Sequence, residues 1–188
     1  MDFLLPESID DTNATQQMID GLIACRKEIE SRRKKRSIQK RQNVEFEYPL
    51  ISIDNNHRFI MKVRQSTILA DNFSVILCYI NKDEDSIILF RCNGPHSGDN
   101  MAQPEHFLYH THTLSEDDWQ NGRKSYPNIR AVVTEYSTVD EAIQYFVNTC
   151  GINDQKHFFK TWQSIEEGYE LSGQLTLEDI GNENGGDS

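Results

Sequence analysis

Four of the chain's six histidines lie within residues 96–112. His106, His110 and His112 belong to the stretch EHFLYHTHT, and His96 lies ten residues before the first of them, in NGPHSGDN. A neutral imidazole binds transition metals, and imidazole also gains and loses a proton close to pH 7. A group of histidines can therefore bind a metal ion or transfer protons. Which of the two applies depends on which imidazole rings lie close together.

Taken as a strand, residues 106–113 place side chains two apart on the same face of a sheet. Such neighbours lie about 6.6 Å apart along the strand, so the rings of His110 and His112 can converge on one small target. His106 would lie about 13 Å from His110, too far to join them. The predicted unit is therefore His110 with His112, on a wet sheet face, completed by residues of the preceding loop.

The loop before this strand, in RCNGPH, supplies the remaining polar groups. Gly94 and Pro95 predict a turn that could aim His96 back across the sheet, and Arg91 and Asn93 lie at its start. The alternative interpretation is that the histidines line an exposed sheet face and have no function. The clustering of four of the six histidines beside a Gly-Pro turn favours a site.

Two chemistries remain open for three converging imidazoles. In the first, they form an open zinc site with water as the fourth ligand and Zn–N distances of about 2.1 Å. In the second, one neutral and one protonated histidine cleave RNA through its own 2′-hydroxyl, while an arginine stabilises the phosphorane. The predicted catalytic residues are His96, His110, His112, Arg91 and Asn93; the predicted metal ligands are His96, His110 and His112, and the cofactor is zinc or none.

The elements that position these residues predict an α+β fold. Apolar residues at steps of four, three and four, beginning at Met18, predict a helix from about residue 14 to 41. From residue 44 the period changes to two, which indicates strands. The expected strands cover residues 44–50, 58–64, 73–80, 86–92, 106–113 and 129–136, and the expected C-terminal helices cover 137–150 and 153–170. The predicted fold is an N-terminal helix, an antiparallel sheet of about five to six strands and two C-terminal helices.

The length of 188 residues suits one domain with extensions. The predicted parts are residues 1–42, the N-terminal helix with a basic block; residues 43–170, the α+β domain with the histidine cluster; and residues 171–188, an acidic tail. The tail is polar and rich in glycine, so we expect it to be disordered at least at its end.

The formal charge of −11 conceals an asymmetry along the chain. Nine of the 19 basic residues lie between Arg26 and Arg41, so the rest of the molecule is more acidic than the average. An acidic surface repels nucleic acid, whereas the basic block could bind it, contact an acidic partner or form a solvated helix face. The predicted nucleic-acid contacts are Arg32, Arg33, Lys34, Lys35 and Arg36.

The sequence also predicts a compartment. No apolar run approaches the roughly 20 residues that a membrane helix needs, and the first residues are acidic where a signal peptide would be basic. The four cysteines are widely scattered and form no C-x-x-C pair. We therefore expect a cytoplasmic protein with reduced thiols and no membrane partner.

Three segments, FRCNGPH, EHFLYHTHT and YSTVDEAIQYFVNTCGI, resemble the C-terminal part of a group of small bacterial proteins, often from mobile elements, with an R-x-N-G/A-x-H and H-x-H plan. A similar arrangement occurs in the TumE-type toxins of toxin–antitoxin pairs. The resemblance covers roughly residues 86–152 and points to the five predicted catalytic residues. The chain differs in carrying Gly94 where those toxins usually carry alanine, in its longer spacer, and in its basic block and acidic tail.

Two functions of different class follow. The first is a histidine-dependent nuclease, directed at RNA, of a bacterial toxin or defence-related system, acting with or restrained by an antitoxin or defence protein. The second is a non-catalytic acidic interaction protein of a phage or mobile element, which imitates a phosphate backbone and blocks a nucleic-acid-binding defence or regulatory protein. The histidines and the basic block favour the nuclease, and the charge of −11 favours the interaction protein. The nuclease ranks ahead.

Overall fold

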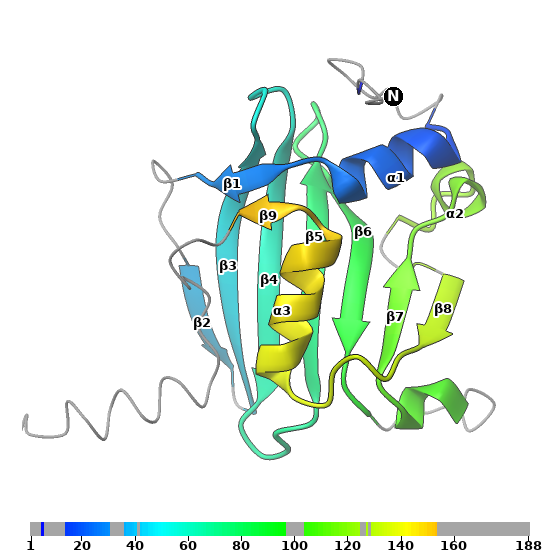
Figure 1. The fold of residues 1–188 in the computed structure, drawn as a ribbon. Coiled ribbons are helices and arrows are strands. Elements are labelled where there is room, and N and C mark those ends of the chain that lie inside the picture. The colour runs from blue at the N-terminus through cyan, green and yellow to red at the C-terminus, as the bar shows by residue number, and fades with distance from the viewer. Residues whose placement is uncertain are drawn as a thin grey trace, which may run out of the picture.

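The fold is one twisted β-sheet with its two longer helices on one face (Figure 1). The computed structural model describes residues 5, 14–30, 36–40, 42–96, 104–124, 127 and 129–153. The strands are β1 (Lys27–Ile29), β2 (Arg36–Lys40), β3 (Asn43–Ser52), β4 (Arg58–Ser66), β5 (Phe73–Ile80), β6 (Ser86–Asn93), β7 (His110–Thr113), β8 (Ile129–Val132) and β9 (Ile152–Asn153). The helices are α1 (Gln16–Ala24), α2 (Glu116–Gln120), α3 (Val139–Thr149) and the 3-10 helix η1 (Pro104–Phe107).

Eight of the nine described strands follow the order β8-β7-β6-β5-β4-β3-β1-β9. The ninth, β2, pairs with β3 on the same edge as β1. Neighbouring strands are antiparallel, except that β1 and β9 are parallel. The predicted α+β class is confirmed, as are the four strands β3 to β6 at the centre of the sheet. Their period-two pattern is visible in β3, where Val44, Phe46, Tyr48 and Leu50 are buried and the residues between them are half-buried.

Helices α1 and α3 lie on the same face of the sheet, α3 over β5 and β6 and α1 across β6 (Figure 1). Phe146 of α3 packs on Phe90 of β6, with ring centroids 5.8 Å apart, and Ile19 and Leu22 of α1 are fully buried. The expected helix over residues 137–150 is confirmed, and it begins with a capping box that residues Thr138 and Glu141 form. The apolar core therefore occupies one face of the sheet, and the residues of the other face are free to be polar.

The predicted helix from residue 14 to 41 is wrong beyond Ala24. Cys25 has φ −57° and ψ 147°, which ends α1, and the chain continues as β1 on the edge of β3. The first part of the basic block is therefore a strand, and residues 36–40 form another strand on the same edge. Strand β3 is long, and the backbone N–H and C=O groups along its edge can pair with further strands. The spacing of apolar residues in the basic block does not show that such pairing partners exist. Residues 31–35 lie outside the described part of the chain.

Three of the described strands, β1, β2 and β9, were not expected. Strands β1 and β9 contain three and two residues, too few to show a period in the sequence, and β1 and β2 lie in the segment predicted to be helical. Strands β7 and β8 were expected, but each contains only four residues of the predicted ranges 106–113 and 129–136. The short helix α2 was not expected either. The second C-terminal helix, expected over residues 153–170, and the tail over residues 171–188 lie outside the described residues, apart from Asn153, which belongs to β9.

Two further expectations concern thiols and membranes. All four cysteines are free thiols, and Cys78, Cys92 and Cys150 are buried. Among the described residues, none of the helices has the length and apolar character required to cross a bilayer.

Lys27 ties together the ends of the two core helices. Its side chain is fully buried, and its ammonium group donates hydrogen bonds to the carbonyl oxygens of Ile23, Cys25 and Cys150 at 2.8, 2.8 and 2.9 Å. It also lies 4.7 Å from the centre of the Phe59 ring. Burial lowers the pKa of Lys27, although the nearby Cys25 and Cys150 oppose this shift. Lys27 is therefore a core residue and not a surface contact of the basic block.

We expect Lys27→Met to lower the free energy of unfolding by about 2–4 kcal/mol, because three buried carbonyl oxygens lose their donor. Urea denaturation followed by circular dichroism measures the change. Lys62→Met is the matched control, since Lys62 makes a half-buried ion pair with Glu47 on the sheet, and we expect it to cost less than about 1 kcal/mol. Equal losses in the two variants would contradict the role given to Lys27.

Candidate functional site

The strand register brings polar residues of β4 to β8 into two rows on the sheet face opposite α1 and α3. Paired residues of neighbouring strands lie on the same face, about 4.8 Å apart. The first row contains Arg64, Ser74, Asn93 and His110; the second contains Lys62, Ile76, Arg91, His112 and Arg130. Residues far apart in the sequence thus form one polar surface.

All five predicted catalytic residues meet on this surface. Asn93 pairs with His110 and Arg91 pairs with His112 across β6 and β7. The ring of His96, just after β6, lies with its centroid 5.3 Å from that of His110, and the rings of His110 and His112 are 5.0 Å apart. The ring of His110 is therefore close to the rings of both His96 and His112.

The expectation that His106 lies out of reach is wrong. Its ring centroid is 4.7 Å from that of His96 and 5.6 Å from that of His110. Residues 104–107 form η1 and not a strand, which shortens the chain between His106 and β7 and turns the ring inward. The signal was Pro104, because proline is favoured at the first position of a helix.

The sequence predicted that the histidines of β7 lie on a solvent-exposed face, but both are buried. His110 is fully buried and the exposed fraction of His112 is 8%. Strand β7 is flanked by β6 and β8, so it is not an edge strand, and the neighbouring imidazole rings cover one another. Substitutions at these two positions therefore affect packing as well as chemistry.

Hydrogen bonds fix the ring orientation and the tautomer of His110. Its Nδ1 lies 2.8 Å from the carbonyl oxygen of Leu108, which can only accept, so Nδ1 carries the proton. Its Nε2 then accepts from the amide of Asn93 at 3.2 Å. The hydroxyl of Ser74 donates to the amide oxygen of Asn93 at 2.7 Å, which holds the amide in this orientation.

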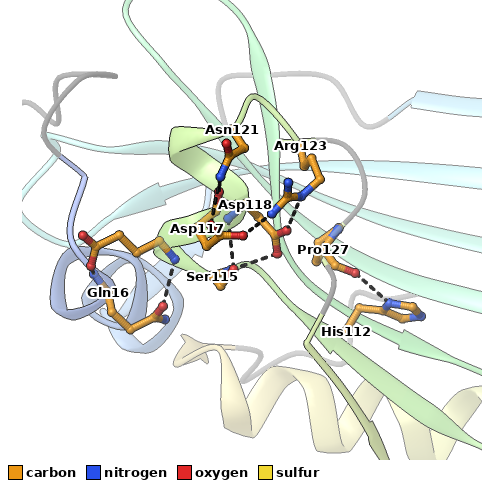
Figure 2. A network of polar contacts seen from close by, with 9 residues as sticks. Gln16, His112, Ser115, Asp117, Asp118, Asn121, Arg123 and Pro127 are labelled. Carbon is orange, nitrogen blue, oxygen red and sulfur yellow. Dashed lines mark hydrogen bonds and ion pairs between the residues drawn. The ribbon is translucent and has the colours of Figure 1, made fainter.

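His112 is held from the other side of the site. Its Nδ1 lies 3.0 Å from the carbonyl oxygen of Pro127, so Nδ1 donates and Nε2 carries the lone pair. Figure 2 shows this contact and a network of hydrogen bonds around α2. Ser115 and Asp118 form a capping box, and the buried carboxylate of Asp118 accepts from Nε of Arg123 at 2.9 Å.

The same network reaches α1, which lies against α2 in Figure 2. The backbone N–H of Gln16 donates to the carboxylate of Glu116 at 3.1 Å, and the backbone N–H of Glu116 donates to the side chain of Gln16 at 2.9 Å. Each residue thus satisfies an N–H group in the first turn of the other's helix.

The charges around the site are positive. Burial, followed by the nearby His106, His110, Arg91 and Arg130, lowers the pKa of His96 to about 4. Burial also lowers the pKa of His112 to about 4; the hydrogen bond to Pro127 opposes this shift, and His110, Arg91 and Arg130 add to it. Both rings are therefore neutral at pH 7. Arg91 and Arg130 are the permanently charged groups that shift these two pKa values, so the site favours an anionic ligand in a protein whose formal charge is −11.

A pocket of about 250 Å³ opens at the first row of residues. It is lined by Arg64, Asn72, Phe73, Ser74, Arg91, Asn93 and His96. Arg64 and Arg91 contribute guanidinium groups to this pocket, Asn72 and Asn93 contribute side-chain amides, and His96 contributes an imidazole. Groups of these kinds bind phosphate oxygens in proteins.

His96, His106 and His110 could hold a metal ion, because one ring nitrogen from each lies within 4.8 Å of the others. His106 takes the place that the sequence analysis gave to His112. Nδ1 of His106 is buried and has no hydrogen-bond partner in the described part of the protein, as a vacant ligand atom would be. Tetrahedral zinc would need these nitrogens about 3.4 Å apart, so the rings would have to move closer by about 1 Å. Nε2 of His110 accepts from the Asn93 amide, so the amide would have to release this nitrogen before it could bind the ion.

Several residues of the site were missed by sequence reasoning. Arg64, Ser74 and Arg130 join it only through strand register, which the sequence does not display. Tyr136 was missed for the same reason: its buried hydroxyl lies 2.8 Å from the carbonyl oxygen of His110 and 3.2 Å from that of Asn93, and donates to them. It thereby ties β6 to β7 directly behind the site.

Of the predicted nucleic-acid contacts, only Arg36 belongs to the described residues, and it lies outside this site. Arg32, Arg33, Lys34 and Lys35 fall outside the described residues, and Arg36 begins β2. Strand β2 pairs with the edge of β3, and β4, β5 and β6 separate β3 from β7. Their predicted role in binding nucleic acid stays a prediction.

Comparison with protein-family models, curated proteins and solved structures found no match to this chain.

Gly94 sets the position of His96 two residues later. A Cβ atom at residue 94 would lie 1.8 Å from the carbonyl oxygen of Asp71 and 2.9 Å from the ring of Phe73. The N–H of Gly94 also donates to the carbonyl of Phe73 at 3.1 Å. This close backbone approach leaves no room for a side chain at this position.

We expect Gly94→Ala to lower the free energy of unfolding by about 2–4 kcal/mol, because the backbone around Asp71 or Gly94 must move apart. Urea denaturation measures the loss. Gly122→Ala is the control: Gly122 has φ +71° and no atom within 4 Å of its added Cβ, so only backbone strain of about 1 kcal/mol is expected. A loss at Gly94 no larger than the loss at Gly122 would contradict the steric argument.

Proposed function

We propose that this protein is a histidine-dependent nuclease that cleaves RNA. The observation that carries the proposal is the meeting of four histidines with Arg91 and Arg130 on one sheet face, where both guanidinium groups act on His96 and His112. Guanidinium groups bind phosphate and stabilise the charge that develops on it. An imidazole that is neutral at pH 7 has a ring nitrogen whose lone pair can accept a proton from a reacting hydroxyl.

The geometry suggests a distinct role for His112. Its Nδ1–H is held by Pro127 and the ring is neutral at pH 7, so the lone pair of Nε2 can accept the proton of a 2′-hydroxyl. The 2′-oxygen then attacks the neighbouring phosphorus and the bond to the 5′-oxygen breaks. The leaving 5′-oxygen takes up a proton from water, and His112 returns the proton it accepted to the solvent. The product ends in a 2′,3′-cyclic phosphate. This reaction requires RNA, because DNA lacks the 2′-hydroxyl.

We expect the purified protein to cleave an RNA oligonucleotide and to leave a DNA oligonucleotide of the same sequence intact. His112→Asn should slow cleavage by about 100-fold or more, because it removes the proton acceptor at Nε2. Arg58→Gln is the control. Arg58 begins β4 and forms an ion pair with the exposed Glu84, so its variant should cleave at the wild-type rate. Gel analysis measures the rate, and mass spectrometry identifies the cyclic phosphate. Equal cleavage of RNA and DNA, or a wild-type rate in His112→Asn, would overturn the proposal.

We also propose zinc as the ion that His96, His106 and His110 hold. Three histidines and one open position are typical of catalytic zinc sites, and bound zinc supplies a Lewis acid for a phosphoryl oxygen. The support is the close approach of the three ring nitrogens and the unpartnered Nδ1 of His106.

We expect about one zinc ion per chain in protein purified without chelator, measured by mass spectrometry of the metal. His106→Ala should lose the ion, because two imidazoles hold zinc far more weakly than three. His112→Asn should keep it, since His112 does not belong to the group of three. A wild type without metal would exclude zinc and leave the acid–base chemistry of the histidines as the basis of cleavage.

The resemblance to TumE-type toxins extends the proposal to a toxin that a protein partner restrains. The formal charge of −11 favours the second function, an acidic interaction protein that imitates a phosphate backbone. A folded protein that cleaves no RNA, and whose effect in cells survives His96→Ala and His112→Asn, would favour this second function.

A further inference from the structure

Next to the polar pocket described above lies a second pocket of different character. Its volume is about 330 Å³, and it is lined by Leu69, Ala70, Asp71, Asn72, Pro95, His96 and Phe107. His96 and Asn72 line both pockets. A ligand that reaches across His96 would therefore meet cationic groups on one side and mainly apolar side chains on the other.

The apolar side chains around the second pocket are unusually exposed. Leu69 has an exposed fraction of 62% and Phe107 one of 54%, although both are large and apolar. Phe107 ends η1, and Leu69 lies in the turn between β4 and β5, so two separate segments present apolar surface to the same hollow. Exposed apolar surface around a hollow is typical of a binding site.

We infer that the second pocket binds the base of a nucleotide whose phosphate lies in the polar pocket. The occupant must join an anionic group to a flat apolar ring system, because Arg64, Arg91 and Asn93 line one side and Phe107 and Leu69 the other. A nucleotide has both parts, and a volume of about 330 Å³ lies at the small end of ligand pockets, which suits a single base. Aromatic side chains such as Phe107 stack on unpaired bases.

This inference rests on the proposed RNA cleavage and names its substrate class as single-stranded RNA. A base within a duplex is stacked and paired, so it cannot enter a separate pocket without leaving the helix. Single-stranded RNA can turn one base out at little cost. His96, at the border of the two pockets, would then lie beside the ribose and its phosphate.

The test measures binding separately from cleavage. Adenosine 3′-monophosphate and inorganic phosphate are the small probes, and calorimetry gives their affinities. Phe107→Ala should weaken binding of the nucleotide by about 5- to 100-fold, because stacking on the base is lost, and should leave binding of inorganic phosphate unchanged. Arg91→Gln should weaken binding of both probes. Ile53→Ala is the matched control, because Ile53 is 53% exposed but lines neither pocket, and it should bind both probes as the wild type does.

The strand preference is tested with the His112→Asn variant, which should bind RNA without cutting it. It should bind a ten-nucleotide single strand of adenosine at least 10-fold more tightly than an RNA duplex of the same length. Unchanged nucleotide affinity in Phe107→Ala, or equal affinity for single and double strands, would overturn the base pocket even if the wild type cleaves RNA. A Phe107-dependent affinity in a wild type that cleaves nothing would instead overturn the nuclease and keep the nucleotide site.

Discussion

The antiparallel register of β5, β6 and β7 is the constraint on which the candidate site depends. It places Ser74 opposite Asn93 and Asn93 opposite His110, so that hydroxyl, amide and imidazole form one chain of hydrogen bonds. A shift of one residue would turn these polar side chains into the apolar core, at a cost that the fold could not offset. Tyr136 reinforces the register from the helix side, since its hydroxyl bonds to the backbone of both β6 and β7.

Helices α1 and α3 cover only one face of the sheet, so the residues that stabilise the fold and those of the candidate site lie on opposite faces. Helices α1 and α3 supply apolar contacts on one face, and the buried ammonium group of Lys27 joins the ends of both helices. The other face carries arginines and histidines that a buried core would reject. There, burial and neighbouring cations keep His96 and His112 neutral at pH 7. A protein of strongly negative formal charge can thus hold a local site for an anion.

The orientation of the site depends on segments that are remote in the sequence. His112 takes its tautomer from the carbonyl of Pro127, and Asp118 of α2 forms an ion pair with Arg123. Helix α2, which carries Asp118, is in turn bonded to the first turn of α1 through Gln16. Imidazole chemistry requires one nitrogen to donate and the other to accept, and these contacts decide which is which.

The sequence by itself determined the four central strands, helix α3 and the convergence of Arg91, Asn93, His96, His110 and His112. These features follow from hydrophobic period and from the alternation of side chains, which are local properties of the chain. Only the tertiary structure decided that α1 stops at Ala24, that β7 is buried and that His106 joins the site. Short strands and 3-10 turns carry little intrinsic preference, so their formation depends on the hydrogen-bond partners and the packing that distant segments provide.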